Sequence, residues 1–162
     1  MIVAAAAAAL VFTGIVPVPF GNDFSVKVKY AETGDIPCPK VDAKPMAPSQ
    51  VTVTVINTTQ HQGLASKATD MLSTAGFQTE EPANSDVEYT GKVRITARAD
   101  SVDAAYSVAR FFPGSHVRLS DAEDATVTVE LGTFYDDTMS AEDVQRVLKS
   151  NDSIEQPAKC RP

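Results

Sequence analysis

Carboxylates are the side chains of this chain that come nearest to a catalytic or metal-binding group. Asp136 and Asp137 are adjacent, and Asp121, Glu123 and Asp124 form a second acidic group shortly before them. Paired carboxylates act as acid and base in glycoside cleavage, and their oxygens bind Ca²⁺, but the spacing here is not that of an EF-hand. Both groups lie in segments expected to be exposed. We therefore predict a solvated acidic edge, with a cell-wall hydrolase or transferase as the alternative.

Histidine offers little further chemistry. His61 and His116 are the two imidazoles of the chain, and they lie in different units of the predicted fold. His61 occupies a turn before a predicted helix, whose N-terminus could favour an anion, but a solvent-facing turn histidine is the preferred interpretation. The sequence shows no nucleophile elbow, phosphate-binding glycine-rich loop or HExxH motif. These observations predict a protein that is not an enzyme and that uses no metal or cofactor.

The two cysteines lie near the two ends of the folded part. Cys38 falls in a proline-rich segment, and Cys160 stands two residues before the C-terminus. In a chain with an export segment, two such cysteines suggest one disulfide, and two free thiols are the alternative. Lipid modification of Cys38 is not favoured, because the residues before it do not resemble a lipoprotein cleavage site.

The elements that position these residues follow from two copies of one strand–helix–strand pattern. In the first copy, valines alternate with threonines from Val51 to Val55, and a helix follows with one apolar face from Leu64 to Ala75. Gly76 stands where a left-handed helix cap is needed, and a short strand follows at 77–79.

The second copy begins with the alternating strand 93–97 and a helix capped by Asp100 or Ser101. A strand at 116–119, a further strand at 126–131 and a last helix at 141–149, capped by Ser140, complete the domain. We predict an α+β fold with two layers, in which a sheet of four or five strands, built from two β-α-β units, carries its helices on one face.

The strands have a polar side throughout, which indicates that one face of the sheet is open to solvent. Strands covered on both faces would be apolar at every position. We predict that this open face, together with the loop after the first strand, is a binding surface. Its candidate residues are Thr52, Thr54, Arg94, Thr96 and Thr128 on the strands, and Asn57, Thr58 and Gly63 in the loop.

Residues 1–20 are predicted to form a membrane anchor. No charged residue occurs from Ile2 to Phe20, and as a helix this run would span roughly 28 Å, close to the thickness of a bilayer core. A cleaved signal peptide is the alternative. No basic residue precedes the run, whereas lysines follow it, so we expect the natural start to lie upstream and to supply a basic cytoplasmic tail. Residues 21–50 read as a proline-rich spacer and residues 151–162 as a polar tail.

Charge excludes one large class of partner. The chain has a formal net charge of -7 and a pI of about 4.7. Nucleic-acid phosphates would repel such a protein, so we expect no nucleic-acid binding.

Several short motifs resemble the LytR C-terminal domain family. They are Val51–Asn57, Gly63-Leu64-Ala65, Ala75-Gly76-Phe77, and the run from Ala125 to Asp137. This module often follows LytR-CpsA-Psr envelope phosphotransferases, and in actinobacteria it also occurs alone behind a membrane anchor. The resemblance brings no catalytic residue to this chain, and the anchor and spacer are too short to hold the phosphotransferase domain.

The resemblance implies a single-pass membrane protein whose domain lies outside the cytoplasm and supports the integrity of the cell envelope. We expect that domain, residues 51–150, to be non-catalytic and to bind a cell-wall polymer or an envelope protein.

Overall fold

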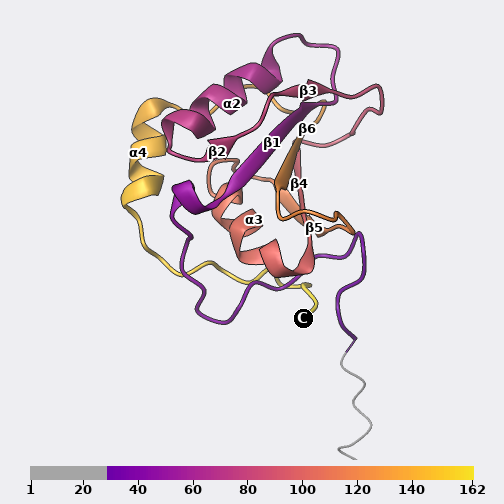
Figure 1. Cartoon of the computed structure of the whole chain (residues 1–162), viewed down its shortest axis with the longest axis vertical. Helices are drawn as coiled ribbons and strands as arrows, with labels where there is room; N and C mark the ends of the chain where they lie inside the picture. Colours follow the sequence, from indigo (N-terminus) through magenta and orange to yellow (C-terminus); the bar gives the residue numbers. More distant parts are fainter. Residues whose placement is uncertain (1–28) are drawn as a thin grey trace, which may run out of the picture.

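The alternating segments form one mixed sheet. The computed structural model describes residues 29–162, and its sheet has six strands. The strands are β1 (Thr52–Asn57), β2 (Gln78–Thr79), β3 (Ala83–Asn84), β4 (Val93–Ala97), β5 (His116–Leu119) and β6 (Val127–Leu131). The helices are α2 (Leu64–Thr74), α3 (Val102–Ala109) and α4 (Ala141–Lys149), with short 3-10 turns at Pro48–Gln50 and Ala99–Ser101. Figure 1 shows their arrangement.

The strand order is β2-β1-β6-β4-β5, with β3 also paired to β1. Strand β6 therefore lies between the two β-α-β units, parallel to β1 and antiparallel to β4. The mixed α+β class is confirmed, and the sheet has more strands than predicted because the chain after α2 pairs with β1 in two pieces, each of two residues.

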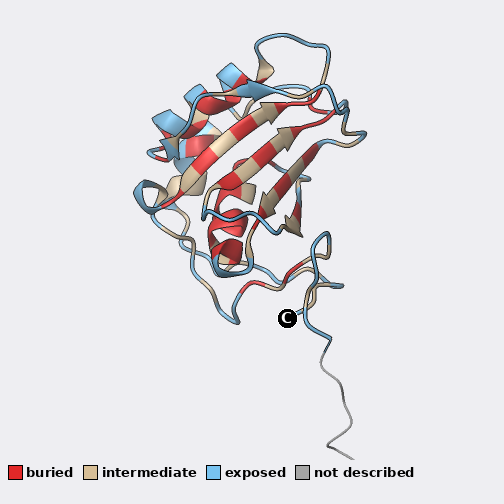
Figure 2. Ribbon diagram, turned by 45° about the vertical axis from the view of Figure 1, so that its right-hand side comes forward, coloured by how far each residue is buried: buried red, intermediate tan, exposed pale blue. Residues whose placement is uncertain are grey.

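The helices of both units cover the same face of the sheet. On β1, β4 and β6 every second side chain is fully buried beneath them, and the residues between are half-buried on the other face. Figure 2 shows this alternation as stripes along the strands, with the helices behind. The expected two-layer arrangement with one uncovered face is therefore present.

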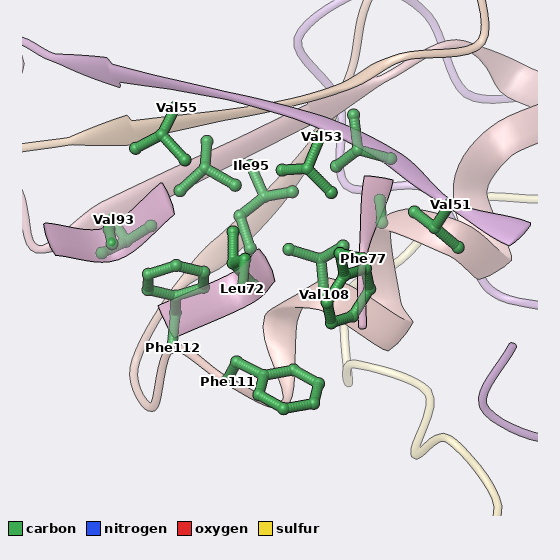
Figure 3. Packing of buried hydrophobic residues seen from close by; sticks show 14 of the residues in the cluster. Val51, Val53, Val55, Leu72, Phe77, Val93, Ile95, Val108, Phe111 and Phe112 are labelled. Atoms are coloured by element: carbon green, nitrogen blue, oxygen red, sulfur yellow. The ribbon is translucent and has the colours of Figure 1, made fainter. Parts of the chain in front are cut away.

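The core lies between the sheet and the helices. Val53, Val55 and Ile95 are fully buried on the sheet side, and Leu72 of α2 and Val108 of α3 face them (Figure 3). The rings of Phe77 and Phe111 meet edge to face with centroids 5.2 Å apart. Burial of each such side chain contributes roughly 1.5–3 kcal/mol, so this cluster supplies most of the driving force for folding.

Of the three predicted helix caps, two are confirmed and one is wrong. The Ser140 hydroxyl caps α4 by accepting from the Asp143 N–H at 3.2 Å. After α2, Gly76 adopts φ +97°, its N–H donates to the Ser73 carbonyl, and the Phe77 N–H donates to the Leu72 carbonyl, as the predicted cap requires. At α3, however, neither Asp100 nor Ser101 caps the helix. The Asp100 carboxylate instead accepts from the Ser101 hydroxyl at 3.1 Å and pairs with Arg98 at 2.8 Å, and a 3-10 turn precedes the helix.

The chain on either side of the domain packs as a terminal belt, defined here as residues 31–50 and 151–162. Cys38 and Cys160 form a disulfide, and the backbones around them pair, with Cys38 N–H donating to the Arg161 carbonyl at 2.8 Å. The Met46 N–H donates to the Ser107 hydroxyl of α3. Residues 31–50 of the expected spacer thus lie against the domain, because bonds such as Met46 to Ser107 hold them there, and the disulfide joins them to residues 151–162.

The segment predicted to be the membrane anchor, residues 1–20, lies outside the described residues. Between residues 29 and 162, none of the helices has both the length and the apolar character needed to cross a bilayer.

Alkaline pH should weaken the attachment of the terminal belt. The Tyr106 hydroxyl donates to the Pro37 carbonyl at 2.8 Å, and burial raises the pKa of Tyr106 to about 12 from the usual 10. The protonated form is favoured in the folded state, so its stabilisation is complete below pH 10 and is lost as the pH rises toward 12. We expect the melting temperature to fall across this interval, and to fall less steeply in Tyr106→Phe. Equal slopes in thermal melts from pH 9 to 12 would contradict this.

Candidate functional site

The open face is defined here as the outward side chains of β1, β6 and β4. The strand register places Thr54, Thr128 and Thr96 in one row across the three strands, with Arg118 of β5 beyond them. The next row is Ile56, Glu130 and Arg94, followed by His116. The predicted strand residues are therefore neighbours, because parallel and antiparallel partners at the same register point to the same side of a sheet.

Hydroxyl groups on the open face are available to a ligand. Within the described part of the chain, the hydroxyls of Thr52, Thr96 and Thr128 make no hydrogen bond, whereas the Thr54 hydroxyl donates to the Glu80 carboxylate. A free threonine hydroxyl donates one hydrogen bond and accepts two. The centre of the sheet is therefore an array of unpaired donors and acceptors held on rigid strands.

Arg94 is fixed in place at one end of this array. Its guanidinium donates to both oxygens of Glu130, at 2.5 and 2.9 Å, and lies 4.6 Å from the centroid of the Tyr89 ring. The hydrogen bond to Glu130 holds the pKa of Arg94 above its usual range. Both side chains remain partly exposed, 37% for Arg94 and 20% for Glu130, so the pair orders the surface without being withdrawn from it.

Tyr89 reaches Arg94 because two glycines leave room for its ring. A Cβ on Gly132 would lie 2.7 Å from the Tyr89 ring and 2.3 Å from the Gly91 carbonyl oxygen. The same loop is tied to β6 through the Thr133 N–H, which donates to the Tyr89 carbonyl at 3.0 Å. The loop between β3 and β4 thus closes over the end of the open face.

Gly132→Ala should disturb this end of the sheet. The new methyl group meets two backbone carbonyls that cannot turn aside as a flexible side chain would, so the loop must shift. We expect a loss of about 1–3 kcal/mol in the free energy of unfolding, measured by urea denaturation, as for other overpacked sites. Gly132 has no positive φ, so the cost there reports the close approach and not backbone strain. A loss below about 0.5 kcal/mol would contradict the close-approach argument.

The predicted loop residues have a different setting. Asn57 and Thr58 are 2% and 3% exposed, and their polar atoms are used within the protein. The Asn57 amide donates to the His61 carbonyl at 2.8 Å, and the Thr58 hydroxyl donates to the Leu131 carbonyl at 2.8 Å. Gly63 is exposed and adopts φ +81° directly before α2. Asn57 and Thr58 therefore shape the loop, and Gly63 lies at its surface.

The two groups of acidic residues lie apart in the chain and form no common site. Asp121, Glu123 and Asp124 precede β6, whereas Asp136 and Asp137 follow it, so the strand separates the two groups. All five carboxylates are exposed, as are His61 and His116. In the described region, histidine, cysteine and carboxylate side chains form no group of three or more suited to a metal ion.

Sequence reasoning missed Tyr89 and Glu80, which border the open face from opposite ends. Neither residue lies in a strand, so the period-two pattern that identified the threonines carries no information about them. Gly91 lies just before β4, and Gly132 follows β6 directly. These two glycines are the sequence signal that a ring approaches the backbone here.

Comparison with protein families identifies the domain. Residues 50–135 match the family described as LytR cell envelope-related transcriptional attenuator. The chain belongs to this family. The match runs from the start of β1 through β6 to Tyr135, and it leaves α4 and most of the terminal belt outside.

One solved structure shares the fold. The soluble domain of a conserved hypothetical secreted protein from Mycobacterium marinum is similar with a TM-score of 0.57 and 24% identity, over 66% of this chain and 75% of that one. The C-terminal domain of RV0431 aligns over 72% of this chain and 99% of that one, at 24% identity and a TM-score of 0.37. None of the curated proteins matches this chain.

Proposed function

We propose that this LytR-family domain is a non-catalytic binding module of the cell envelope, and that it holds a cell-wall polymer or an envelope protein on its open face. The observation that carries this proposal is the row Thr54, Thr128 and Thr96, in which the hydroxyls of Thr128 and Thr96 are unpaired and lie beside a fixed Arg94. Such a surface can form many hydrogen bonds to a hydroxyl- and amide-rich polymer. The row lies across three neighbouring strands, which suits an extended ligand.

A site outside the cytoplasm is supported by the disulfide and by the relatives. Disulfides persist in oxidising compartments, and Cys38–Cys160 joins residues 122 positions apart. The M. marinum relative is described as a secreted protein. In our proposal, residues 1–20 anchor the chain in the cell membrane with a single pass, and the domain supports envelope integrity from the outer side.

Binding to cell wall can be tested by co-sedimentation of the purified full chain with insoluble cell wall from M. marinum. The variant carries Thr52→Val, Thr96→Val and Thr128→Val, which removes three free hydroxyls and keeps the β-branched shape that strands favour. At about 0.5–1.5 kcal/mol for each hydrogen bond, we expect at least a tenfold loss of affinity.

The control carries Thr74→Val, the same change at an exposed threonine at the end of α2, away from the open face. We expect it to sediment like the unmodified chain. If the triple variant also sediments like the unmodified chain, the open face does not bind wall polymer.

A protein partner is tested in cells with a photo-crosslinking residue at Thr96, and at Thr74 as the control. A partner of the open face should be caught from Thr96 and not from Thr74. The proposed function is refuted if the triple threonine variant still sediments with cell wall and Thr96 catches no partner that Thr74 does not catch.

A further inference from the structure

A cavity lies away from the open face, against α4. It has a volume of about 450 Å³, within the range of small-molecule sites. The end of α3, the start of β4 and the segment between β6 and α4 enclose it. Residues after Tyr135 supply much of its wall, and they lie outside the segment that matches the family.

The floor of the cavity is aromatic. Phe111 and Phe112 at the end of α3 line it together with Tyr135, and the rings of Phe112 and Tyr135 have centroids 6.2 Å apart. Met139 lines it from the side. An apolar group of the size of one amino-acid side chain would be shielded from water in this cavity.

Tyr135 carries a hydroxyl with no partner. The residue is 7% exposed, and its hydroxyl has no hydrogen bond in the described part of the molecule. A buried polar group without a partner is destabilising, and it needs an explanation. Burial, together with the charge of nearby Asp137, raises the pKa of Tyr135 to about 12, so the hydroxyl stays protonated and can donate.

The rim offers one free charge of each sign. Lys92 and Asp137 line the cavity and, within residues 29–162, take part in no ion pair, whereas the other two charged residues of the rim, Asp143 and Arg146, pair with each other. The Lys92 ammonium can bind a carboxylate, and the Asp137 carboxylate can bind an ammonium group. The Asp137 carboxylate also accepts from the Thr138 N–H at 2.8 Å, which leaves its second oxygen for a ligand, so a ligand that pairs with both side chains carries a negative and a positive group.

We propose that this cavity binds a free amino acid with an apolar side chain. The side chain lies on Phe111, Phe112 and Tyr135, the carboxylate faces Lys92, and the ammonium group faces Asp137. In this proposal the side chains that cover the buried Tyr135 hydroxyl move aside on binding, and the hydroxyl then donates to a ligand oxygen. This site is additional to the wall or protein binding proposed for the open face.

Three probes that share the phenylalanine side chain test whether both charged groups of the ligand are bound. L-phenylalanine carries both charges, N-acetyl-L-phenylalanine only the negative one, and L-phenylalaninamide only the positive one. Their dissociation constants are measured by NMR titration of the ¹⁵N-labelled full chain. We expect L-phenylalanine to bind most tightly, and each analogue about fivefold more weakly, the value of one partly exposed charge pair.

Variants assign the contacts. Lys92→Gln should weaken the binding of L-phenylalanine about fivefold and leave the binding of L-phenylalaninamide unchanged. Asp137→Asn should also weaken the binding of L-phenylalanine about fivefold, but leave the binding of N-acetyl-L-phenylalanine unchanged. Tyr135→Phe should weaken L-phenylalanine about tenfold, whereas Tyr89→Phe, the same change at the open face, should have no effect.

The proposal is overturned if L-phenylalanine at tens of millimolar leaves the amide signals of Lys92 and Tyr135 unmoved. It is also overturned if the three probes bind equally, or if Tyr135→Phe leaves binding unchanged, since a merely structural tyrosine would behave in that way. The triple threonine variant should keep full L-phenylalanine binding, and Lys92→Gln should keep wall binding, so the two proposals fail separately.

Discussion

Replacing Cys38 and Cys160 by serine is expected to lower the free energy of unfolding by about 4–5 kcal/mol. The disulfide closes a loop of 122 positions, and in the chain-entropy model a cross-link of this span restricts the unfolded chain by about that amount. Small domains are stable by about 5–15 kcal/mol in total, so the loss is a large fraction. Denaturation in guanidinium chloride, followed by circular dichroism, measures it.

Reduction of the unmodified chain is the matched control. A reducing agent should bring the unmodified chain to the stability of the double serine variant and leave the variant itself unchanged. A difference below about 1 kcal/mol between the two chains would show that the hydrogen bonds of the terminal belt, and not the disulfide, fix its position.

The same variant tests how the terminal belt is held. Its backbone bonds to the domain, such as Gly34 N–H to the Leu119 carbonyl at 2.7 Å, are few and near the surface. Without the disulfide we expect amide hydrogen exchange to speed up in residues 31–50 and 151–162 first, because local opening there exposes little core. Uniform acceleration across β1, β4 and β6 would instead show that the belt unfolds together with the sheet.

Local patterns in the sequence were enough to predict most elements. The alternation of Val51 to Val55 and of residues 93–97 is a direct record of one buried and one exposed side, and the structure has both strands. Gly76 marked the end of α2 because only a residue without Cβ enters the left-handed region at no steric cost. These signals act over a few residues, so one sequence suffices to read them.

Non-local pairing was not predictable in the same way. Nothing in the alternation of residues 126–131 tells which neighbours the strand takes, and β6 pairs with both β1 and β4. The pairing depends on burial summed over the whole sheet. The prolines at 37, 39, 45 and 48 predicted extended chain, but Pro48 begins a 3-10 turn, and the docking of the segment depends on distant partners such as Tyr106.

The candidate site was likewise predictable only where a local pattern determined it. Thr52, Thr54, Arg94, Thr96 and Thr128 share the open face because period two places them there. Asn57 and Thr58 were predicted to bind as well, but they are buried, and their polar atoms bond to the backbone carbonyls of His61 and Leu131. Asn57 ends β1 in phase with the buried Val53 and Val55, so a polar residue of a strand is evidence for the open face only when it is in phase with Thr52 and Thr54.

Leu72→Ala should destabilise the domain by about 3–5 kcal/mol. Leu72 is 0% exposed on the buried face of α2, where it packs in the cluster with Ile95 and Phe112 (Figure 3). Truncation removes three buried carbon atoms and leaves a cavity that the rigid sheet can only partly fill. Urea denaturation gives the loss from the shift of the midpoint at constant slope.

Leu64→Ala makes the same chemical change at the start of the same helix, where the side chain is partly exposed. Alanine also favours helix slightly more than leucine does, so both variants gain equally from propensity and differ only in burial. We expect Leu64→Ala to cost less than half as much as Leu72→Ala. Comparable losses for the two variants would mean that buried and partly exposed positions of α2 contribute equally to stability. That result would contradict the packing of the buried face of α2, which positions the loop before the helix.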